Sequence, residues 1–107
     1  MQASAIIPVV AIVAIASAGC GRNDSNCGPS CSVISSCTDR IYQSCMEECE
    51  GDFNEASDAS IACGTAVDDR AACVAGLSCA ELDAWTQKVP PEDYPCRDED
   101  LAVDDEC

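Results

Sequence analysis

The chain has 107 residues, of which 20 are acidic and five are basic, with no histidine and a formal net charge of −15. This charge excludes nucleic acid and anionic lipid headgroups as binding partners, because both repel a strongly acidic surface. Without histidine the chain also lacks the Ser-His and Cys-His pairs of nucleophilic enzymes and any histidine metal ligand, so we expect no enzymatic activity, no metal site and no cofactor.

The N-terminal segment has the features of a secretory signal. No charged side chain occurs before Arg22, and residues 5–18 are almost wholly Ala, Ile, Val and Ser. This apolar run is shorter than the roughly 20 residues that a membrane-spanning helix needs, which favours cleavage over an uncleaved anchor. The sequence therefore predicts a signal peptide over residues 1–19 and a polar tether over residues 20–30.

The end of this segment offers two cleavage sites. Cleavage after Ala18 would release a chain with 11 cysteines, an odd number that leaves a free thiol in an oxidising compartment. If Cys20 instead becomes the lipidated first residue, ten cysteines remain and can form five disulfides.

Ser17-Ala18-Gly19-Cys20 resembles the lipobox of bacterial lipoproteins, and the chain as a whole resembles the small, acidic, cysteine-rich members of that group. The resemblance implies a lipid anchor at Cys20. It also implies a position in the cell envelope, facing the periplasm or the exterior, with the membrane as a partner through the N-terminal lipid. Secretion without a lipid is the alternative.

The remaining cysteines predict a disulfide-stabilised domain. Large apolar residues are too few to offset the conformational entropy lost when the chain becomes ordered. Cross-links must supply the rest, which requires an oxidising compartment. The candidate disulfide residues are Cys27, Cys31, Cys37, Cys45, Cys49, Cys63, Cys73, Cys79, Cys96 and Cys107.

The body of the domain is a block without proline between Pro29 and Pro90, and we assign residues 31–89 to a helical domain. Apolar and cysteine side chains recur with helical spacing over residues 32–50, which predicts the first helix. Gly51 is expected to end it.

Two further helices are predicted. The alanine-rich residues 55–77 predict the second helix, and Gly64 leaves open whether this helix is continuous or broken. Ser78 and Glu81 have the spacing of a capping box, which predicts a short third helix over residues 79–87.

Residues 90–107 differ from the domain body. Three prolines and several acidic runs predict an irregular, solvated tail. Cys96 and Cys107 nevertheless predict that disulfides fix this tail to the helices. The expected fold is therefore small, disulfide-rich and all-α: an antiparallel helical hairpin, a short third helix and an irregular stapled tail.

A hairpin that turns near residue 55 predicts nested disulfides, although sequence alone leaves the connectivity open. The facing positions would be Cys31 with Cys79, Cys37 with Cys73, and either Cys49 or Cys45 with Cys63. The remaining cysteines would join the tether and the tail to the hairpin.

Two cysteine motifs point to another arrangement. Cys27-x3-Cys31 and Cys45-x3-Cys49 resemble the twin Cys-x3-Cys hairpins of small intermembrane-space chaperones, in which each motif lies on its own helix. Gly28-Pro29 inside the first motif argues against a helix there. We therefore prefer the resemblance to bacterial lipoproteins.

Two acidic stretches, residues 50–55 and 98–106, suggest weak calcium binding, although the first lacks the glycine and the twelfth acidic residue of a calcium-binding hand. The sequence favours a non-enzymatic, lipid-anchored extracytoplasmic module with an interaction or structural role and an unknown protein partner. The alternatives are a freely secreted effector, such as an inhibitor or toxin, and a weak calcium-binding protein.

Overall fold

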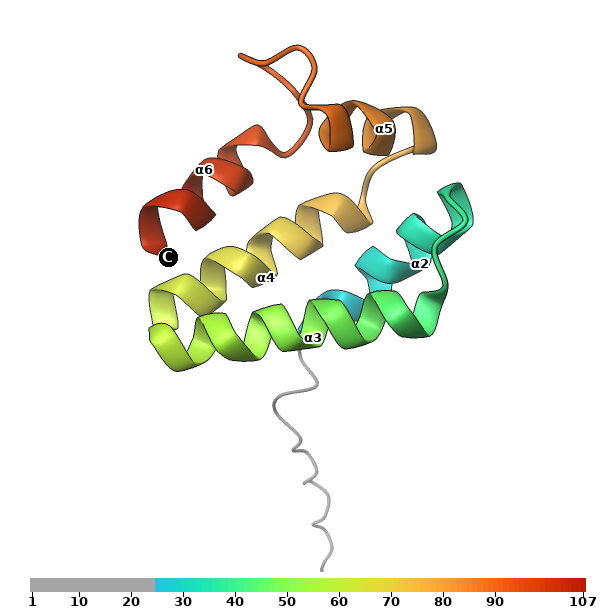
Figure 1. The fold of residues 1–107 in the computed structure, drawn as a ribbon. Helices are drawn as coiled ribbons and strands as arrows, with labels where there is room; N and C mark the ends of the chain where they lie inside the picture. The colour runs from blue at the N-terminus through green and yellow to red at the C-terminus, as the bar shows by residue number, and fades with distance from the viewer. Residues whose placement is uncertain (1–24) are drawn as a thin grey trace, which may run out of the picture.

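The computed structural model describes residues 25–107 as five helices arranged around α4 (Figure 1). The helices are α2 (Cys27–Cys37), α3 (Tyr42–Ala59), α4 (Ile61–Ala75), α5 (Cys79–Gln87) and α6 (Arg97–Glu106). These residues contain no strand, so the expected all-α, disulfide-rich fold class is confirmed. The predicted signal peptide over residues 1–19 and the lipidation candidate Cys20 lie outside the described residues.

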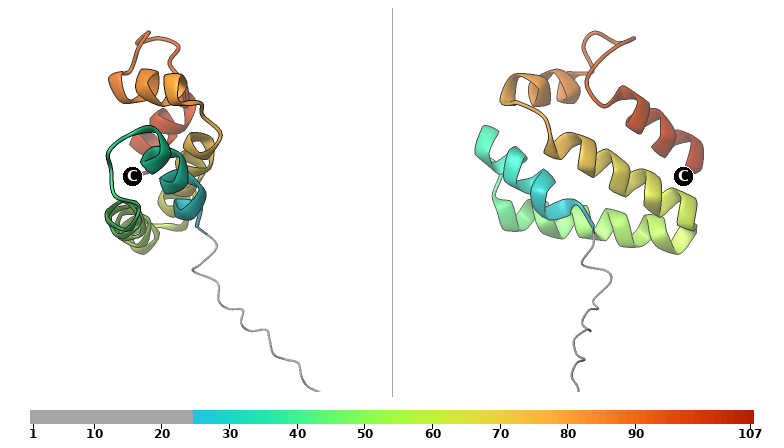
Figure 2. Two further views of the ribbon diagram at one scale, coloured as in Figure 1. Left: turned by 90° about the vertical axis from the view of Figure 1, so that its right-hand side faces the viewer. Right: turned by 180° about the vertical axis from the view of Figure 1, so that it is seen from behind.

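The helix α4 is the centre of the arrangement. It packs against α3, which precedes it as the other arm of a hairpin, and against α6, which runs back alongside it. Figure 2 shows α2 on the back of the α3–α4 hairpin, where α2 contacts both helices. The short helix α5 crosses the end of the bundle and contacts α2.

The predicted helix over residues 32–50 is in fact two helices. The Thr38 hydroxyl donates a hydrogen bond to the Ile34 carbonyl at 2.7 Å and accepts one from the Arg40 backbone N–H at 3.0 Å. Such local bonds compete with continuation of a helix, so α2 ends here. The chain then turns, and α3 begins at Tyr42.

The start of α2 corrects the assignment of residues 20–30 to a tether. Asn26 is the N-cap, so Pro29 occupies the third helical position, where a backbone N–H has no acceptor within the helix and proline is tolerated. The Asp68 carboxylate accepts hydrogen bonds from the backbone and side-chain amides of Asn26, at 2.6 and 2.9 Å. Thus α4 holds the first turn of α2 in place.

The predicted helix over residues 55–77 is divided between α3 and α4. The first of these continues through Gly51, and the break falls at Ser60, whose backbone is extended. The Ser60 hydroxyl accepts a hydrogen bond from the Cys63 backbone N–H at 2.9 Å and so caps α4. A single residue therefore ends α3 and starts α4.

Gly64 lies inside α4 and does not break it. A Cβ at this position would lie 3.0 Å from Ser57 Cα on the facing turn of α3, and closer still to the Ser57 hydroxyl. Glycine is required here because the two helices approach too closely for a side chain.

The helix α5 has the predicted bounds. The Ser78 hydroxyl accepts a hydrogen bond from the Glu81 backbone N–H at 3.1 Å, and the Glu81 carboxylate accepts one from the Ser78 backbone N–H at 2.9 Å. These two bonds complete the predicted capping box.

The C-terminal segment is not irregular throughout, because residues 97–106 form α6. Its first turn carries three acidic side chains, which interact favourably with the positive end of the helix dipole. The acidic run that predicted a solvated tail thus stabilises the start of a helix. The irregular part is the loop over residues 88–96.

The hydrophobic core of the described residues is small and rich in sulfur. Ten apolar residues are buried, and five of them are cysteines. The buried aliphatic side chains larger than alanine are Val67, Val74 and Leu82. Cystines therefore fill positions that larger aliphatic side chains take in an ordinary domain. No helix within residues 25–107 is both long enough and apolar enough to cross a membrane.

Candidate functional site

The ten cysteines predicted to form disulfides all do so. The pairs are Cys27–Cys49, Cys31–Cys45, Cys37–Cys79, Cys63–Cys107 and Cys73–Cys96. Their Cα–Cα distances range from 4.9 to 5.9 Å, which is normal for a disulfide. Five disulfides in so short a chain indicate an oxidising compartment outside the cytosol.

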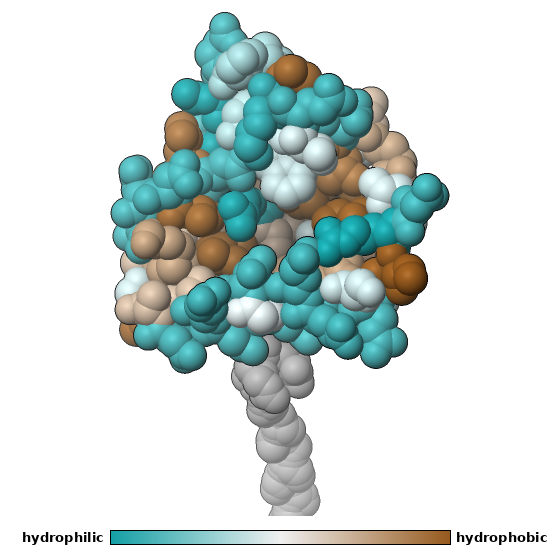
Figure 3. Space-filling view, viewed as in Figure 1, coloured by the Kyte–Doolittle hydropathy of each residue, from teal (hydrophilic) through white to brown (hydrophobic). Residues whose placement is uncertain are grey.

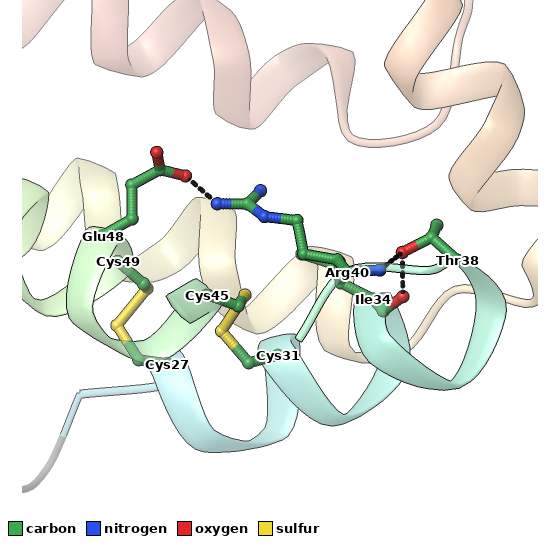
Figure 4. The surroundings of a disulfide bond; sticks show 8 residues. All are labelled: Cys27, Cys31, Ile34, Thr38, Arg40, Cys45, Glu48 and Cys49. Carbon is green, nitrogen blue, oxygen red and sulfur yellow. Dashed lines mark hydrogen bonds and ion pairs between the residues drawn. A yellow bond between two sulfur atoms is a disulfide. The ribbon is translucent and has the colours of Figure 1, made fainter. Parts of the chain in front are cut away.

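Two disulfides join α2 to α3 as a nested pair (Figure 4). Cys27–Cys49 and Cys31–Cys45 are both centred on residue 38, where the chain turns between the helices. Each Cys-x3-Cys motif lies on its own helix, as in the twin-motif hairpins that the spacing resembles. Gly28-Pro29 argued against a helix at the first motif, and that expectation is wrong, because α2 includes both residues.

The predicted ladder of disulfides is wrong because the hairpin turn is not near residue 55. The position of a turn decides which cysteines of the two flanking helices face each other. The turns lie at residues 38–41 and at Ser60. None of the predicted pairs forms, namely Cys31 with Cys79, Cys37 with Cys73, and Cys49 or Cys45 with Cys63.

The expectation that disulfides fix the C-terminal segment is confirmed. Cys73–Cys96 and Cys63–Cys107 hold the two ends of α6 against α4. The fifth disulfide, Cys37–Cys79, joins the end of α2 to the start of α5. Every described helix is therefore linked to at least one other helix by a disulfide.

A buried carboxylate lies where α4, α5 and α6 meet. Asp100 is 8% exposed, and its Oδ2 accepts hydrogen bonds from Lys88 Nζ and Tyr94 OH, both at 2.9 Å. Arg70 Nη1 lies 3.6 Å from Oδ1. The Lys88 ammonium also lies 5.1 and 5.2 Å from the ring centroids of Trp85 and Tyr94, within range of a cation–π interaction. We call these five residues the Asp100 cluster.

The contacts within the Asp100 cluster shift the pKa values of the Asp100 carboxyl and the Tyr94 phenol. Burial raises the pKa of the Asp100 carboxyl, but the hydrogen bonds from Lys88 and Tyr94 and the charge of Lys88 outweigh burial, so the pKa is lowered. Burial and the hydrogen bond to Asp100 raise the pKa of the Tyr94 phenol. At neutral pH the carboxylate is therefore ionised and the phenol is protonated. Sequence reasoning missed this cluster, because its members come from four separate segments.

A hollow of about 190 Å³ opens between α2, α3, α4 and α5. Figure 3 shows the molecule from the same side as Figure 1. Apolar side chains are visible near the middle of this side, with polar side chains above and below them. The apolar lining includes Ile34, Val67, Ala71, Val74 and Trp85. The charged lining consists of Arg40, Glu48, Asp52 and Arg70. We call this feature the central hollow.

The two acidic stretches considered for calcium are helical. Residues 50–55 lie within α3 and residues 98–106 lie within α6. Successive side chains of a helix point in different directions, so neither stretch wraps its oxygen atoms around one point as a calcium-binding loop does. Glu99 lies close to the sulfur atoms of Cys73 and Cys96, but these two form a disulfide and supply no thiolate ligand.

No protein-family model, no curated protein and no solved structure matches the chain.

Proposed function

We propose that the chain is a non-enzymatic module of the cell envelope, exported by residues 1–19 and anchored to a bacterial membrane by lipid on Cys20. The observation that carries the proposal is the pairing of the other cysteines. All ten cysteines from Cys27 to Cys107 have disulfide partners among themselves. Cys20 is the eleventh cysteine of the sequence, and lipidation accounts for its thiol.

The acid–base groups of the domain favour a binding or structural role over catalysis. The sequence has no histidine, and the ten paired cysteines offer no nucleophilic thiolate. The buried Asp100 carboxylate accepts hydrogen bonds from Lys88 and Tyr94, and its lowered pKa makes it a poor proton acceptor. The Asp100 cluster thus holds the loop over residues 88–96 against α6, which supports a structural role for these groups.

The charge of the domain fits an anchored protein that stands away from the bilayer. A net charge of −15 repels anionic headgroups, so the lipid and not the protein surface would supply membrane affinity. Stable anchoring requires more than one acyl chain, which bacterial-type N-terminal modification of a cysteine would provide.

An intact-mass measurement of the protein from its native membrane fraction tests this proposal. We expect a chain that begins at Cys20 and carries the added mass of acyl chains. Its mass should be lower than that of the fully reduced chain by ten hydrogen atoms, because five disulfides have formed. Cys20→Ser should lose the acyl mass and leave the membrane fraction. Asn23→Ser, in the same segment, should keep both and serves as the matched control.

A different mass would contradict anchoring. A chain that begins at Gly19 with an unmodified Cys20 thiol would support the freely secreted effector instead. The measurement reads the N-terminus directly, so it gives an answer whether or not a partner is known.

A further inference from the structure

We propose that the central hollow binds a small organic acid with one aromatic or branched aliphatic group and one carboxylate. The volume sets the size of the ligand. An apolar protein cavity of about 150 Å³ is enough to hold benzene, so a hollow of about 190 Å³ has room for one ring or one branched chain. Val67, Val74 and Trp85 supply an apolar lining for such a group.

The charge of the ligand follows from Arg70. Residues 25–107 contain 19 acidic and four basic side chains, and two of these four, Arg40 and Arg70, line the hollow. The Arg70 side chain is 31% exposed, and its ion-pair partner, Asp100 Oδ1, is 3.6 Å away, beyond hydrogen-bonding distance. Arg70 donates no hydrogen bond to another of residues 25–107, and a partly desolvated guanidinium beside an apolar wall is suited to a carboxylate.

The Asp100 cluster, which supplies Arg70 to the hollow, carries more positive than negative charge. Lys88 and Arg70 share the single carboxylate of Asp100, which leaves one positive charge in excess. The acidic residues that line the hollow, Glu48 and Asp52, both come from α3. A bound carboxylate is therefore expected next to Arg70, with the apolar group directed away from it along Val74 and Trp85.

Arg40 offers a second contact at little cost. From the turn before α3 it reaches along this helix to Glu48, as Figure 4 shows. Both side chains of this ion pair are exposed, at 41% and 65%, and such surface pairs contribute little to stability. Arg40 can therefore leave its ion pair with Glu48 and bind a ligand carboxylate instead, with little change in the stability of the fold.

Titration of the oxidised, full-length mature protein with 3-phenylpropionate, followed by ¹H–¹⁵N NMR, tests the proposal. We expect saturable shifts of the Trp85 indole N–H and of backbone amides near Ala71. The alcohol 3-phenylpropanol has the same ring without the charge and should bind at least about tenfold more weakly, since a charge-assisted hydrogen bond is lost.

Variants distinguish specific binding from general attraction. Arg70→Gln should weaken 3-phenylpropionate binding by about tenfold or more. Arg97→Gln makes the same change in net charge outside the hollow, where Arg97 Nε donates to the Pro91 carbonyl, and should bind as the wild type does. Ala71→Leu should fill the hollow and abolish binding, and it tests the site even if Arg70→Gln does not fold.

Three results would overturn the proposal: no saturable shift, equal binding of the acid and the alcohol, or equal weakening by Arg70→Gln and Arg97→Gln. A peptide that ends in phenylalanine and binds where 3-phenylpropionate does not would assign the hollow to a polypeptide C-terminus instead. None of these outcomes depends on the N-terminal lipid, so they leave the test of anchoring independent.

Discussion

At Gly64 the helices α3 and α4 approach so closely that a methyl group does not fit. The Cβ of an alanine would lie 3.0 Å from Ser57 Cα, a backbone atom that cannot rotate away. We predict that Gly64→Ala lowers the free energy of unfolding by about 1–3 kcal/mol, as overpacking of a core does. Thermal unfolding of the oxidised protein, followed by far-ultraviolet circular dichroism, measures the change.

Gly51 supplies the matched control, because it also lies inside a helix but has no atom within 4 Å of an added Cβ. Alanine loses less conformational entropy than glycine on folding, so Gly51→Ala should raise stability by about 0.5–1 kcal/mol. If Gly64→Ala were equally stabilising, the close approach of α3 and α4 would be refuted.

Asp100 should make the fold sensitive to acid. Its pKa is lowered in the folded protein relative to the ordinary value of about 3.9, so the ionised carboxylate contributes stability above that pH. The contribution is lost as the pH falls through the folded pKa. We predict that Asp100→Asn lowers the melting temperature at neutral pH and loses less additional stability than the wild type below about pH 4.

A series of melting curves from neutral to acidic pH measures this effect. Asp105→Asn removes an exposed carboxylate from the same helix and should leave the acid dependence close to that of the wild type. Identical acid dependence in the wild type and Asp100→Asn would show that the cluster does not stabilise the fold through its charge.

At the scale of helices, local patterns predicted the features that local contacts determine. The bounds of α5 match because its capping box, Ser78 with Glu81, lies within four residues of sequence. The breaks at Thr38 and Ser60 depend on single hydroxyl groups that bond to the backbone. Periodicity cannot show whether a serine or threonine will do so, and it therefore predicts continuous helices across both positions.

Features that depend on tertiary contacts were not predictable in the same way. An acidic run without apolar periodicity predicts a solvated tail, yet Cys96 and Cys107 tie both ends of α6 to α4. The rule that disulfide partners lie symmetrically about a turn holds for the pair centred on residue 38, but the turn itself was misplaced. The candidate site joins Arg70 to Asp100 across thirty residues, and no local pattern marks them as partners.

The disulfides between helices should differ in their ease of reduction. Thiol–disulfide exchange requires the attacking thiolate to reach a sulfur atom. Cys79 and Cys107 are exposed, whereas Cys27 and Cys31 are 1% and 0% exposed. We predict that a limiting amount of reductant reduces Cys37–Cys79 and Cys63–Cys107 first. The two disulfides that join α2 to α3 should be reduced later.

Alkylation after stepwise reduction, followed by peptide mass mapping, gives the order. The species that accumulates first should have free thiols at Cys79 or Cys107 and should keep the nested pair of α2 and α3. Loss of all five disulfides in a single step would contradict the predicted order, because reduction would then follow global unfolding.

At the scale of the whole molecule, two features oppose folding. The net charge is −15, and the acidic side chains repel one another more strongly in the compact state than in the unfolded chain. Among residues 25–107 the buried aliphatic residues are few, and half of the ten buried apolar residues are cysteines. The disulfides act against both effects, because they restrict the unfolded chain and also fill the core.

Full reduction should therefore unfold the protein. Five disulfides at about 2–4 kcal/mol each contribute roughly 10–20 kcal/mol, which is comparable to or larger than the roughly 5–15 kcal/mol net stability of an ordinary domain. We predict that reduction and alkylation with iodoacetamide, which adds no charge, abolish cooperative melting and most of the helical signal. The same alkylation without reductant is the control and should change neither. A reduced protein that kept its helical signal and melting temperature would show that apolar packing alone maintains the fold, and the inference of an oxidising compartment would lose its physical basis.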